Sequence, residues 1–377
     1  MKPILRAAAG LVVLATACSA PAAPRTVATT APAAGAPVLP APTGKHPVGT
    51  TTLHLTDRSR PDPWVQEAKA RELMVTLWYP ATAGNGRPAP YMSAKESELL
   101  LKGKRFADAS YDTLSRTRTH AFTGAKPAGR EGTLPLVVLS PGFTMPRTSL
   151  TALAEDLASR GYVVAGVDHT YENYATTFPD GRVAECVACD SDSDFGFGSK
   201  VVGIRAADVS FVLDRLAGAW PGASLIDRDR IAMAGQSIGG AAALAAMAKD
   251  SRIRAGIDMD GTTYARLPKG GLARPFLFLG SATHTRGGRD VSWDRDWKLL
   301  TGWKRWFVLP GGDHQSFTDT PLLATALGVK PPGTLTAARS AEVTRAYVSA
   351  FLDEHLRGKR RPLLDGASPG YPEVVPG

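Results

Sequence analysis

A serine between two glycines is the residue best placed for chemistry in this sequence. Ser237 is the centre of the segment GQSIG, which follows the apolar run 231–234 and precedes an alanine-rich run. On a turn from strand to helix, this G-x-S-x-G pattern exposes the serine hydroxyl and places the next N–H, that of Ile238, at a helix N-terminus. The flanking glycines fit because a Cβ there would collide with the neighbouring strand or helix. The pattern predicts a nucleophilic serine, the alternative being a plain strand–turn–helix junction.

A serine hydroxyl is a weak nucleophile and needs a histidine base, which a carboxylate must orient. In enzymes with a serine on such a strand-to-helix turn, the order along the chain is Ser, acid, His. Only His284, His314 and His355 follow Ser237 and can therefore be the base. His355 falls inside an expected helix. We expect His314 to be the base, because it follows the last expected strand in a glycine-rich loop, where catalytic residues gather. His284 is the alternative.

The acid is expected at the end of a strand that follows the serine. Asp260 ends the expected strand 255–260, directly before a glycine, and Asp258 faces the same side but deeper. After the next expected strand, 275–280, the first carboxylate is Asp290. Asp260 is the leading candidate, with Asp290 and Asp258 as alternatives.

A second oxyanion donor is expected in the loop after the apolar run 134–140. The sequence there is SPGF, and Gly142 would let the backbone approach a substrate closely. We expect the N–H groups of Phe143 and Ile238 to form the oxyanion hole.

Strand and helix patterns alternate after residue 133. The expected strands are 134–140, 162–168, 231–235, 255–260, 275–280 and 306–310, and the expected helices are 150–161, 200–218 and 338–356. This alternation predicts an α/β class fold with a mostly parallel sheet covered on both faces. Segments 53–57 and 73–80 predict an antiparallel start of the sheet. Residues 89–132 lack a strand signal and predict a small lid or, equally, a surface insertion.

The first residues have the composition of an export signal. Residues 1–17 carry two basic residues, a short apolar run and small residues before Cys18, which predicts a lipoprotein signal peptide. The alternative is ordinary cleavage near Ala20 or Ala23. Residues 18–47 are rich in Ala, Pro and Thr and predict a tether, with the folded domain and its tail at 48–377. We expect an exported protein, anchored to the membrane by lipid or secreted.

The charge pattern and the cysteines exclude some functions. The net charge is +9, but the basic residues are scattered and not interleaved with aromatics, which argues against nucleic acid. In an exported protein, Cys186 and Cys189 are expected to form a disulfide, with a redox C-x-x-C as the alternative. The acidic run 190–194 imitates a calcium loop, but Phe195 and Val201 occupy the positions that need Gly and Glu. We therefore expect an acidic surface loop and no metal, with a metal site as the alternative.

Five segments resemble one known family. LSPGF, DLASRGYVVAGVDHTY, GQSIGG, AGIDMDG and GGDHQSFTD, in this order, resemble the platelet-activating-factor acetylhydrolase-like serine esterases, and secreted bacterial members in particular. The resemblance implies an α/β-hydrolase fold over nearly the whole mature chain. Pro141 stands where eukaryotic members have histidine, which weakens the case for a lipid substrate. The resemblance implies Ser237 as nucleophile, Asp260 as acid, His314 as base, and Phe143 and Ile238 as oxyanion donors.

The function expected from these observations is that of an extracytoplasmic serine carboxylic-ester hydrolase. It would act on a small-molecule or lipid ester through an acyl-enzyme, as a monomer and without a cofactor. Activity would fall below about pH 6 to 7, as the histidine base becomes protonated. The alternatives are a cutinase-like polyester hydrolase and a non-catalytic lipoprotein that binds an envelope ligand.

Overall fold

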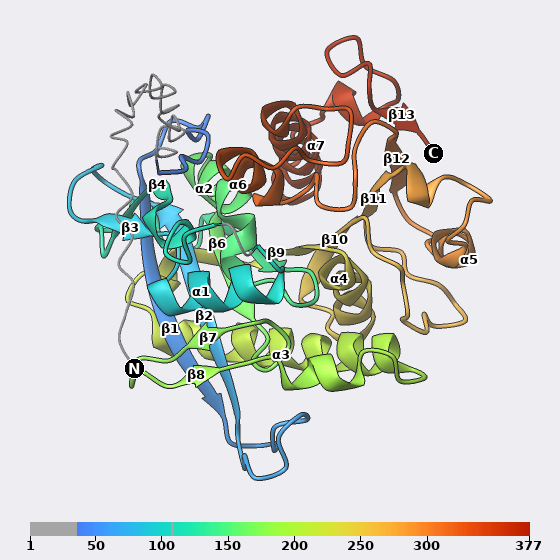
Figure 1. Ribbon diagram of the computed structural model, residues 1–377. Helices are drawn as coiled ribbons and strands as arrows, with labels where there is room; N and C mark the ends of the chain where they lie inside the picture. The colour runs from blue at the N-terminus through green and yellow to red at the C-terminus, as the bar shows by residue number, and fades with distance from the viewer. Residues whose placement is uncertain (1–35, 107–108) are drawn as a thin grey trace, which may run out of the picture. The chain divides into compact units, whose positions relative to one another are not determined.

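The computed structural model of the protein describes residues 36–106 and 109–377 (Figure 1). The expected signal peptide 1–17, the candidate lipidation site Cys18 and the tether up to residue 35 lie outside the described residues. No helix among the residues described has the length and apolar character needed to cross a membrane.

One large sheet runs through the described domain, in the strand order β13-β12-β11-β10-β9-β5-β6-β2-β1-β4-β3. Its strands are β1 (Val48–Asp57), β2 (Arg71–Pro80), β3 (Pro88–Pro90), β4 (Arg118–Thr123), β5 (Leu134–Ser140), β6 (Val163–Asp168), β9 (Ile226–Gln236), β10 (Ile253–Met259), β11 (Phe276–Ser281), β12 (Lys304–Leu309) and β13 (Val375–Pro376). Six neighbouring strands of the sheet are parallel to one another: β12, β11, β10, β9, β5 and β6. Strand β2 is antiparallel to both β6 and β1. The mostly parallel sheet and its antiparallel start are as predicted.

Helices cover both faces of this sheet (Figure 1). On one face lie α3 (Phe197–Ala219) and α4 (Ile238–Lys249), and on the other α2 (Thr151–Ser159) and α7 (Ala337–Arg357). Alternate residues of β5 serve the two cores: Leu136 and Val138 pack with α3 and α4, whereas Val137 and Leu139 pack with α2 and α7. Because both faces of the strand are buried, the sequence shows an unbroken apolar run there.

Residues 89–132, which lack a strand signal in the sequence, nevertheless contain strands. They hold most of β3, then α1 (Ala94–Gly103) and then β4, which pairs with β1 in parallel. In β4 only Ala121 is fully buried, so the strand has no apolar pattern. It is held by backbone pairing and by the buried Glu155 carboxylate, which accepts hydrogen bonds from the N–H groups of His120 and Ala121.

The expected boundary between tether and domain at residue 47 also needs correction. Leu39 is buried, its neighbour Val38 bridges to Arg118, and the Thr43 N–H donates to Asp156 at 2.8 Å. Chain from residue 36 onward therefore belongs to the folded unit. Composition gave no sign of this, because one apolar side chain in a Pro- and Ala-rich segment is enough to anchor it.

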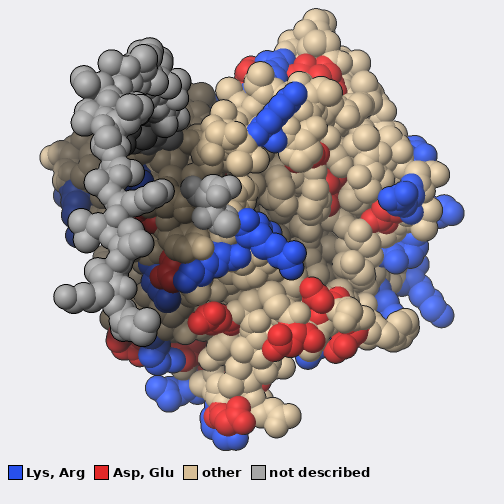
Figure 2. Space-filling view, viewed as in Figure 1, with Lys and Arg blue, Asp and Glu red and all other residues tan. Residues whose placement is uncertain are grey.

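Charged side chains of both signs are spread over the face in Figure 2, where basic side chains gather in a band over α1 with acidic ones beside it. Within the ranges that the structure describes, no group of three or more His, Cys, Asp or Glu side chains is arranged to hold a metal ion.

Candidate active site

Ser237 lies on the sharp turn between β9 and α4. Its backbone has φ 56° and ψ −132°, a strained conformation for a residue with a side chain. A Cβ on Gly235 would lie 2.2 Å from the carbonyl carbon of Gly239, and one on Gly239 would lie 2.1 Å from the Ser140 carbonyl oxygen. Only glycine fits at these two positions, for the steric reason that the sequence pattern suggested. The 12-residue helix α4 begins immediately after the serine and directs its N-terminal dipole toward it.

Asp260 and His314 come from different loops and meet at the carboxyl end of the sheet. Asp260 follows β10, His314 lies in the loop after β12, and His314 Nδ1 is 2.7 Å from Asp260 Oδ2. The Asp260 side chain is 1% exposed, whereas that of His314 is 49% exposed and so open to a substrate. Gln236 Nε2 donates to the His314 carbonyl oxygen at 2.7 Å and ties this loop to the residue before Ser237.

The loop after β5 lies against the elbow. A Cβ on Gly142 would be 2.5 Å from Gln236 Oε1 and 3.4 Å from Ser237 Cβ, so the backbone approaches closely here. Within residues 36–106 and 109–377, neither the Phe143 nor the Ile238 N–H donates a hydrogen bond. Both groups are therefore available to a negative charge that develops beside Ser237.

A buried network of charged side chains, which was not predicted from the sequence, supports the loop after β5. Arg205 of α3 donates to the Pro141 carbonyl oxygen at 2.5 Å, to Ser140 Oγ at 3.2 Å and to Glu172 at 2.7 Å. His169 Nε2 is 3.0 Å from the same Ser140 Oγ. Burial, and then the Arg205 charge, lower the pKa of His169, so this imidazole is neutral at neutral pH. A signal was present in the sequence: an arginine on the otherwise apolar face of the helix expected at 200–218.

The segment after His169 pairs with the loop after β5. The Thr144 N–H donates to the Glu172 carbonyl oxygen at 2.9 Å, and the Tyr174 N–H donates to the Thr144 carbonyl oxygen at 3.3 Å. Thr144, Tyr171, Ser237 and Asp260 are four of the five non-glycine residues with positive φ in the described chain. Backbone strain is therefore concentrated around the candidate site, as it is at many functional sites.

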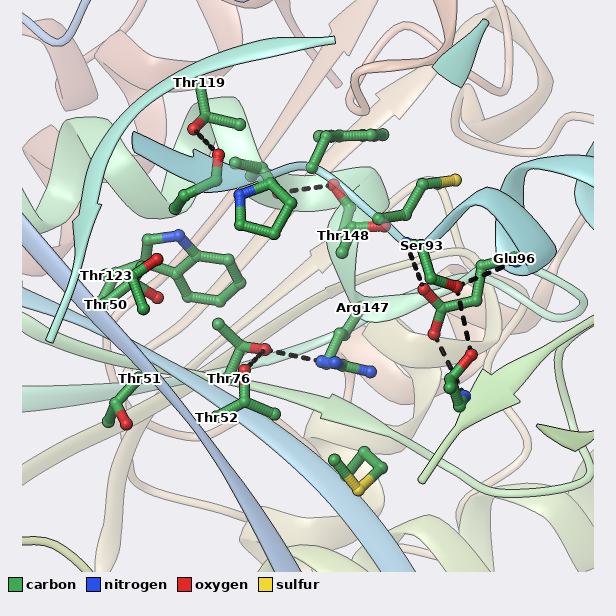
Figure 3. Close-up of a pocket in the computed structure, with 18 of the residues that line it drawn as sticks. Thr50, Thr51, Thr52, Thr76, Ser93, Glu96, Thr119, Thr123, Arg147 and Thr148 are labelled. Atoms are coloured by element: carbon green, nitrogen blue, oxygen red, sulfur yellow. Dashed lines mark hydrogen bonds between the residues drawn. The ribbon is translucent and has the colours of Figure 1, made fainter. Parts of the chain in front are cut away.

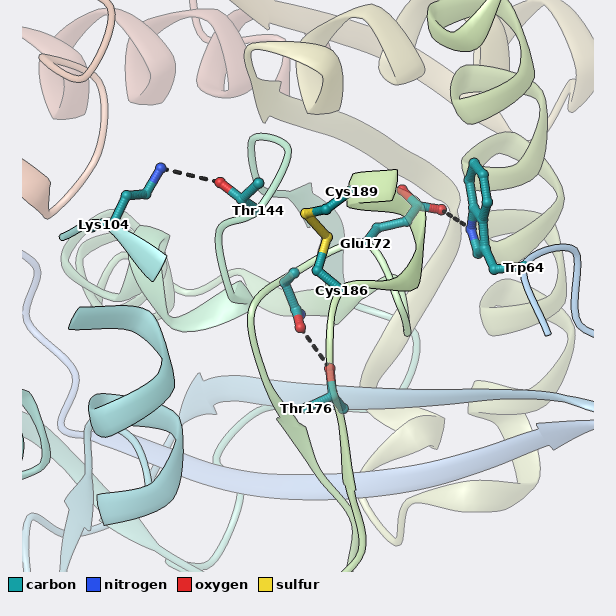
Figure 4. Close-up of a disulfide and its surroundings, with 8 residues drawn as sticks. Trp64, Lys104, Thr144, Glu172, Thr176, Cys186 and Cys189 are labelled. Atoms are coloured by element: carbon teal, nitrogen blue, oxygen red, sulfur yellow. Dashed lines mark hydrogen bonds between the residues drawn. A yellow bond between two sulfur atoms is a disulfide. The ribbon is translucent and has the colours of Figure 1, made fainter. Parts of the chain in front are cut away.

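A disulfide joins Cys186 and Cys189 near this segment (Figure 4). Between the two cysteines, the Ala188 N–H donates to the Tyr171 carbonyl oxygen at 2.9 Å. The cross-link thus braces the segment that pairs with the loop after β5.

The alternative acids do not contact His314. Asp258 Oδ1 accepts from the Gly261 N–H at 2.9 Å, and burial raises the pKa of Asp258 well above its usual range. Asp290 Oδ2 lies 3.2 Å from Nε2 of His284, the alternative base. His284 Nδ1 in turn lies 2.9 Å from Asp260 Oδ1, so this histidine contacts the carboxylate oxygen that His314 does not. His355 lies in α7, as expected, and packs on Trp303.

A buried aspartate anchors the loop that carries His314. Asp319, the last residue of the motif HQSFTD, accepts hydrogen bonds from the Ala152 N–H in the first turn of α2, at 3.2 and 3.3 Å to its two oxygens. The Tyr91 hydroxyl donates to it at 3.3 Å. This explains why a carboxyl group follows His314 at this spacing.

An apolar cavity of about 250 Å³ lies beside the site. It is formed by Leu100, Leu101, Lys104, Phe106, Leu114, Met145, Gln315, Thr320, Leu323, Ala324 and Leu327. Gln315 adjoins His314, and its buried Oε1 has no hydrogen-bond partner in the described chain. The residues from α1 show that segment 89–132 both widens the sheet and walls this cavity, on the side opposite α6 (Thr320–Ala326).

A second cavity, of about 400 Å³, lies between the α1 segment, α2 and strands β1 and β2 (Figure 3). Its walls carry many threonines and Arg147, whose guanidinium donates to Thr76 at 2.7 Å. None of Ser237, Asp260 and His314 lines it, so it is separate from the candidate site.

The sheet order, the helices on both faces and the turn at Ser237 are those of the α/β-hydrolase fold. A family model described as platelet-activating factor acetylhydrolase, isoform II, matches residues 33–189 and 202–361. The chain belongs to this family, which confirms the resemblance found in the sequence.

Similar proteins are described as esterases or as an acetylhydrolase. A ferulic acid esterase of known structure from Streptomyces cinnamoneus is 47% identical, with a TM-score of 0.82 over 91% of this chain and 99% of its own. A protein of Arthroderma benhamiae described as a probable 1-alkyl-2-acetylglycerophosphocholine esterase is 31% identical over 372 residues, 90% of this chain and 93% of its own. The platelet-activating factor acetylhydrolase of Canis lupus familiaris is 28% identical over 225 residues, 49% of this chain and 48% of its own. The protein is therefore a carboxylic ester hydrolase.

Proposed function

We propose that Ser237, His314 and Asp260 act as a nucleophile–base–acid triad. The observation that carries this proposal is the 2.7 Å contact between His314 Nδ1 and the buried Asp260 carboxylate, in a loop tied to the serine elbow. His314 Nδ1 donates to Asp260, which leaves Nε2 free to accept the Ser237 proton. Ser237 Oγ then attacks the ester carbonyl carbon.

The oxyanion forms against the N–H groups of Phe143 and Ile238, at the start of α4. Collapse of the tetrahedral intermediate expels the alcohol, which takes the proton from His314, and leaves an acyl group on Ser237. Water, deprotonated by His314, then releases the acid and restores the serine.

We propose esters of hydroxylated aromatic acids as the substrate class. The cavity beside His314 has largely apolar walls, which suit the ring of an aromatic acid. The name of the relative from Streptomyces cinnamoneus supports this choice. The rival class, acetylated glycerophospholipids, rests on the name of the Arthroderma benhamiae relative.

The test compares hydrolysis of ethyl ferulate, p-nitrophenyl acetate and a 1-alkyl-2-acetylglycerophosphocholine by wild type and Ser237→Ala. We expect the highest kcat/KM among the natural ester types for the ferulate and no activity above background in the variant. An equal rate in Ser237→Ala would overturn the triad. A preference for the phospholipid would overturn only the substrate class.

The acid is tested by Asp260→Asn and Asp290→Asn. We expect the first to lower kcat by several orders of magnitude, because an amide favours the wrong tautomer of His314. Asp290→Asn keeps a group of the same size at a carboxylate that does not contact His314, so its loss must be much smaller. The reverse ranking would reassign the acid.

We propose further that the enzyme is exported and held at the membrane through a lipid on Cys18. The order of charged, apolar and small residues before Cys18 supports this, and the 17 residues between Cys18 and residue 36 supply a spacer ahead of the folded unit. Metabolic labelling with a fatty acid tests it: label on wild type but not on Cys18→Ser is expected. Label on neither, with protein in the medium, would show secretion without an anchor.

A further inference from the structure

His284 is enclosed between two carboxylates on the side of Asp260 that faces away from His314. Its Nδ1 is 2.9 Å from Asp260 Oδ1, and its Nε2 is 3.2 Å from Asp290 Oδ2. Its ring stacks on Trp293 at 4.2 Å between centroids, and its side chain is 4% exposed. Both ring nitrogens thus face carboxylate oxygens, an arrangement in which the imidazole donates twice and carries a positive charge.

The partners of His284 are themselves fixed. The Ser292 N–H donates to Asp290 Oδ1 at 2.8 Å, and the Thr262 hydroxyl donates to Asp290 Oδ2. The Trp306 indole N–H donates to the His284 carbonyl oxygen at 2.8 Å, which holds the backbone of the residue. Such a constrained ring sets the position of the Asp260 oxygen that it contacts.

A charge count explains why the site needs a second cation. Asp260 is almost completely buried, and the proposed base His314 must be neutral before it accepts a proton. Without another cation, the resting enzyme would hold a buried carboxylate with no opposite charge, which is costly. Burial alone would lower the pKa of His284, but Asp260 and Asp290 raise it to about 9. The remaining carboxyl group near His284 is Asp258, which its raised pKa keeps protonated.

We propose that His284 is a positioning residue that balances the charge of Asp260 and aims its carboxylate at His314, so that the catalytic unit is a chain of five groups from Ser237 through His314, Asp260 and His284 to Asp290. This inference rests on the proposed triad. His284 acts through Asp260: one carboxylate oxygen is held by His284 and by the Ser281 N–H, at 2.6 Å, and the other is left for His314.

The chain also sets the pH range of the base. The His284 cation withdraws negative charge from the carboxylate that stabilises protonated His314. Removal of this cation leaves the carboxylate more strongly attractive, so His314 holds its proton more tightly. The acidic limb of the kcat/KM profile then moves to higher pH.

The test compares His284→Leu, which removes both donors, with His284→Asn, whose amide can still donate to Asp260. For p-nitrophenyl acetate we expect His284→Leu to lower kcat about tenfold or more, with KM changed by less than about twofold, a loss below the full contribution of a general base. His284→Asn should recover most of this loss. The acidic limb of the kcat/KM profile should move to higher pH in His284→Leu. It should also do so in Asp290→Asn, which keeps His284 but removes the negative charge that keeps this histidine protonated.

The matched control is His54→Asn, because His54 Nε2 also contacts a carboxylate, that of Glu72 at 2.7 Å, in a pair exposed on β1 and β2. It should leave kcat and the pH profile unchanged. Wild-type kcat and an unmoved acidic limb in folded His284→Leu or Asp290→Asn would overturn the inference. Equal losses in the Leu and Asn variants would also overturn it. Neither outcome affects the triad, which fails only if Ser237→Ala stays active.

Discussion

The Gln236 side-chain amide donates to the backbone carbonyl of His314, with 2.7 Å between Nε2 and the oxygen. This bond joins the serine elbow to a loop that lies 78 residues further along the chain. The Gln236 side chain is completely buried, and its bond to the His314 carbonyl fixes the distance between two loops of the site. Gln236, the residue before Ser237, thus positions the candidate base as well as forming part of the turn.

Replacement of Gln236 should therefore affect catalysis more than folding. Gln236→Leu removes the donor at similar size, and Gln236→Glu places a carboxyl group against the His314 carbonyl. We expect kcat to fall about tenfold in the first and further in the second, because base and nucleophile are no longer held together. Steady-state kinetics and thermal unfolding check this. Unchanged kcat in both variants would show that the bond has no catalytic role.

Arg205 should be needed both for stability and for the oxyanion loop. Arg205→Met removes the donor nearest to the buried Glu172 carboxylate, at 2.7 Å, leaves it with Trp64 at 3.1 Å and Arg71 at 3.7 Å, and frees the Pro141 carbonyl. We expect unfolding free energy to fall by about 3 to 5 kcal/mol and kcat to fall in the protein that remains folded. Chemical denaturation measures the first effect. An exposed pair offers the control: Arg182→Met, beside Glu72 and Asp180, should cost less than about 1 kcal/mol.

The cavity beside His314 should select substrates by size. Ala324→Phe fills it from α6, so we expect kcat/KM for ethyl ferulate to fall about tenfold or more, with p-nitrophenyl acetate little affected. Thr325→Phe, at the exposed neighbouring position, should change neither substrate. Equal losses for both esters in Ala324→Phe would mean that the cavity is not the acyl site.

Stability should depend on pH through His284. Its pKa is raised from 6.5 to about 9, so its stabilising contribution is fully present below about pH 6.5 and is lost as pH rises through 9. Wild type should exceed His284→Asn in unfolding free energy by roughly 1 to 3 kcal/mol near pH 6, and the difference should shrink toward pH 10. A difference that stays constant or grows over this range would show that His284 carries no charge in the folded protein.

The central strands, the helices α2, α3 and α7 and the candidate site residues could be predicted because each leaves a local pattern. The runs 134–139 in β5 and 231–234 in β9 are apolar, since both faces of these strands are buried there, and Gly235 and Gly239 mark a turn that no larger residue fits. In contrast, β4 is stabilised by its neighbours and by Glu155, so its own residues show no strand pattern.

The residues that support the site could not be predicted from the sequence, for a related reason. His284 was one of two candidate bases, and only the fold shows that it stands behind Asp260 rather than beside Ser237. Arg205 and Glu172 lie 33 residues apart, and nothing in the spacing brings them to the Pro141 carbonyl. Such long-range polar contacts follow from the assembled sheet, not from local periodicity.

The most direct test of the account is to trap the acyl-enzyme. Wild type and Ser237→Ala are mixed with ethyl ferulate or p-nitrophenyl acetate, quenched in acid during turnover, digested and mapped by mass spectrometry. We expect an acyl group on the peptide that contains Ser237 in wild type, and neither adduct nor turnover in Ser237→Ala. Turnover with no adduct at Ser237, together with a Ser237→Ala variant as active as wild type, would contradict it.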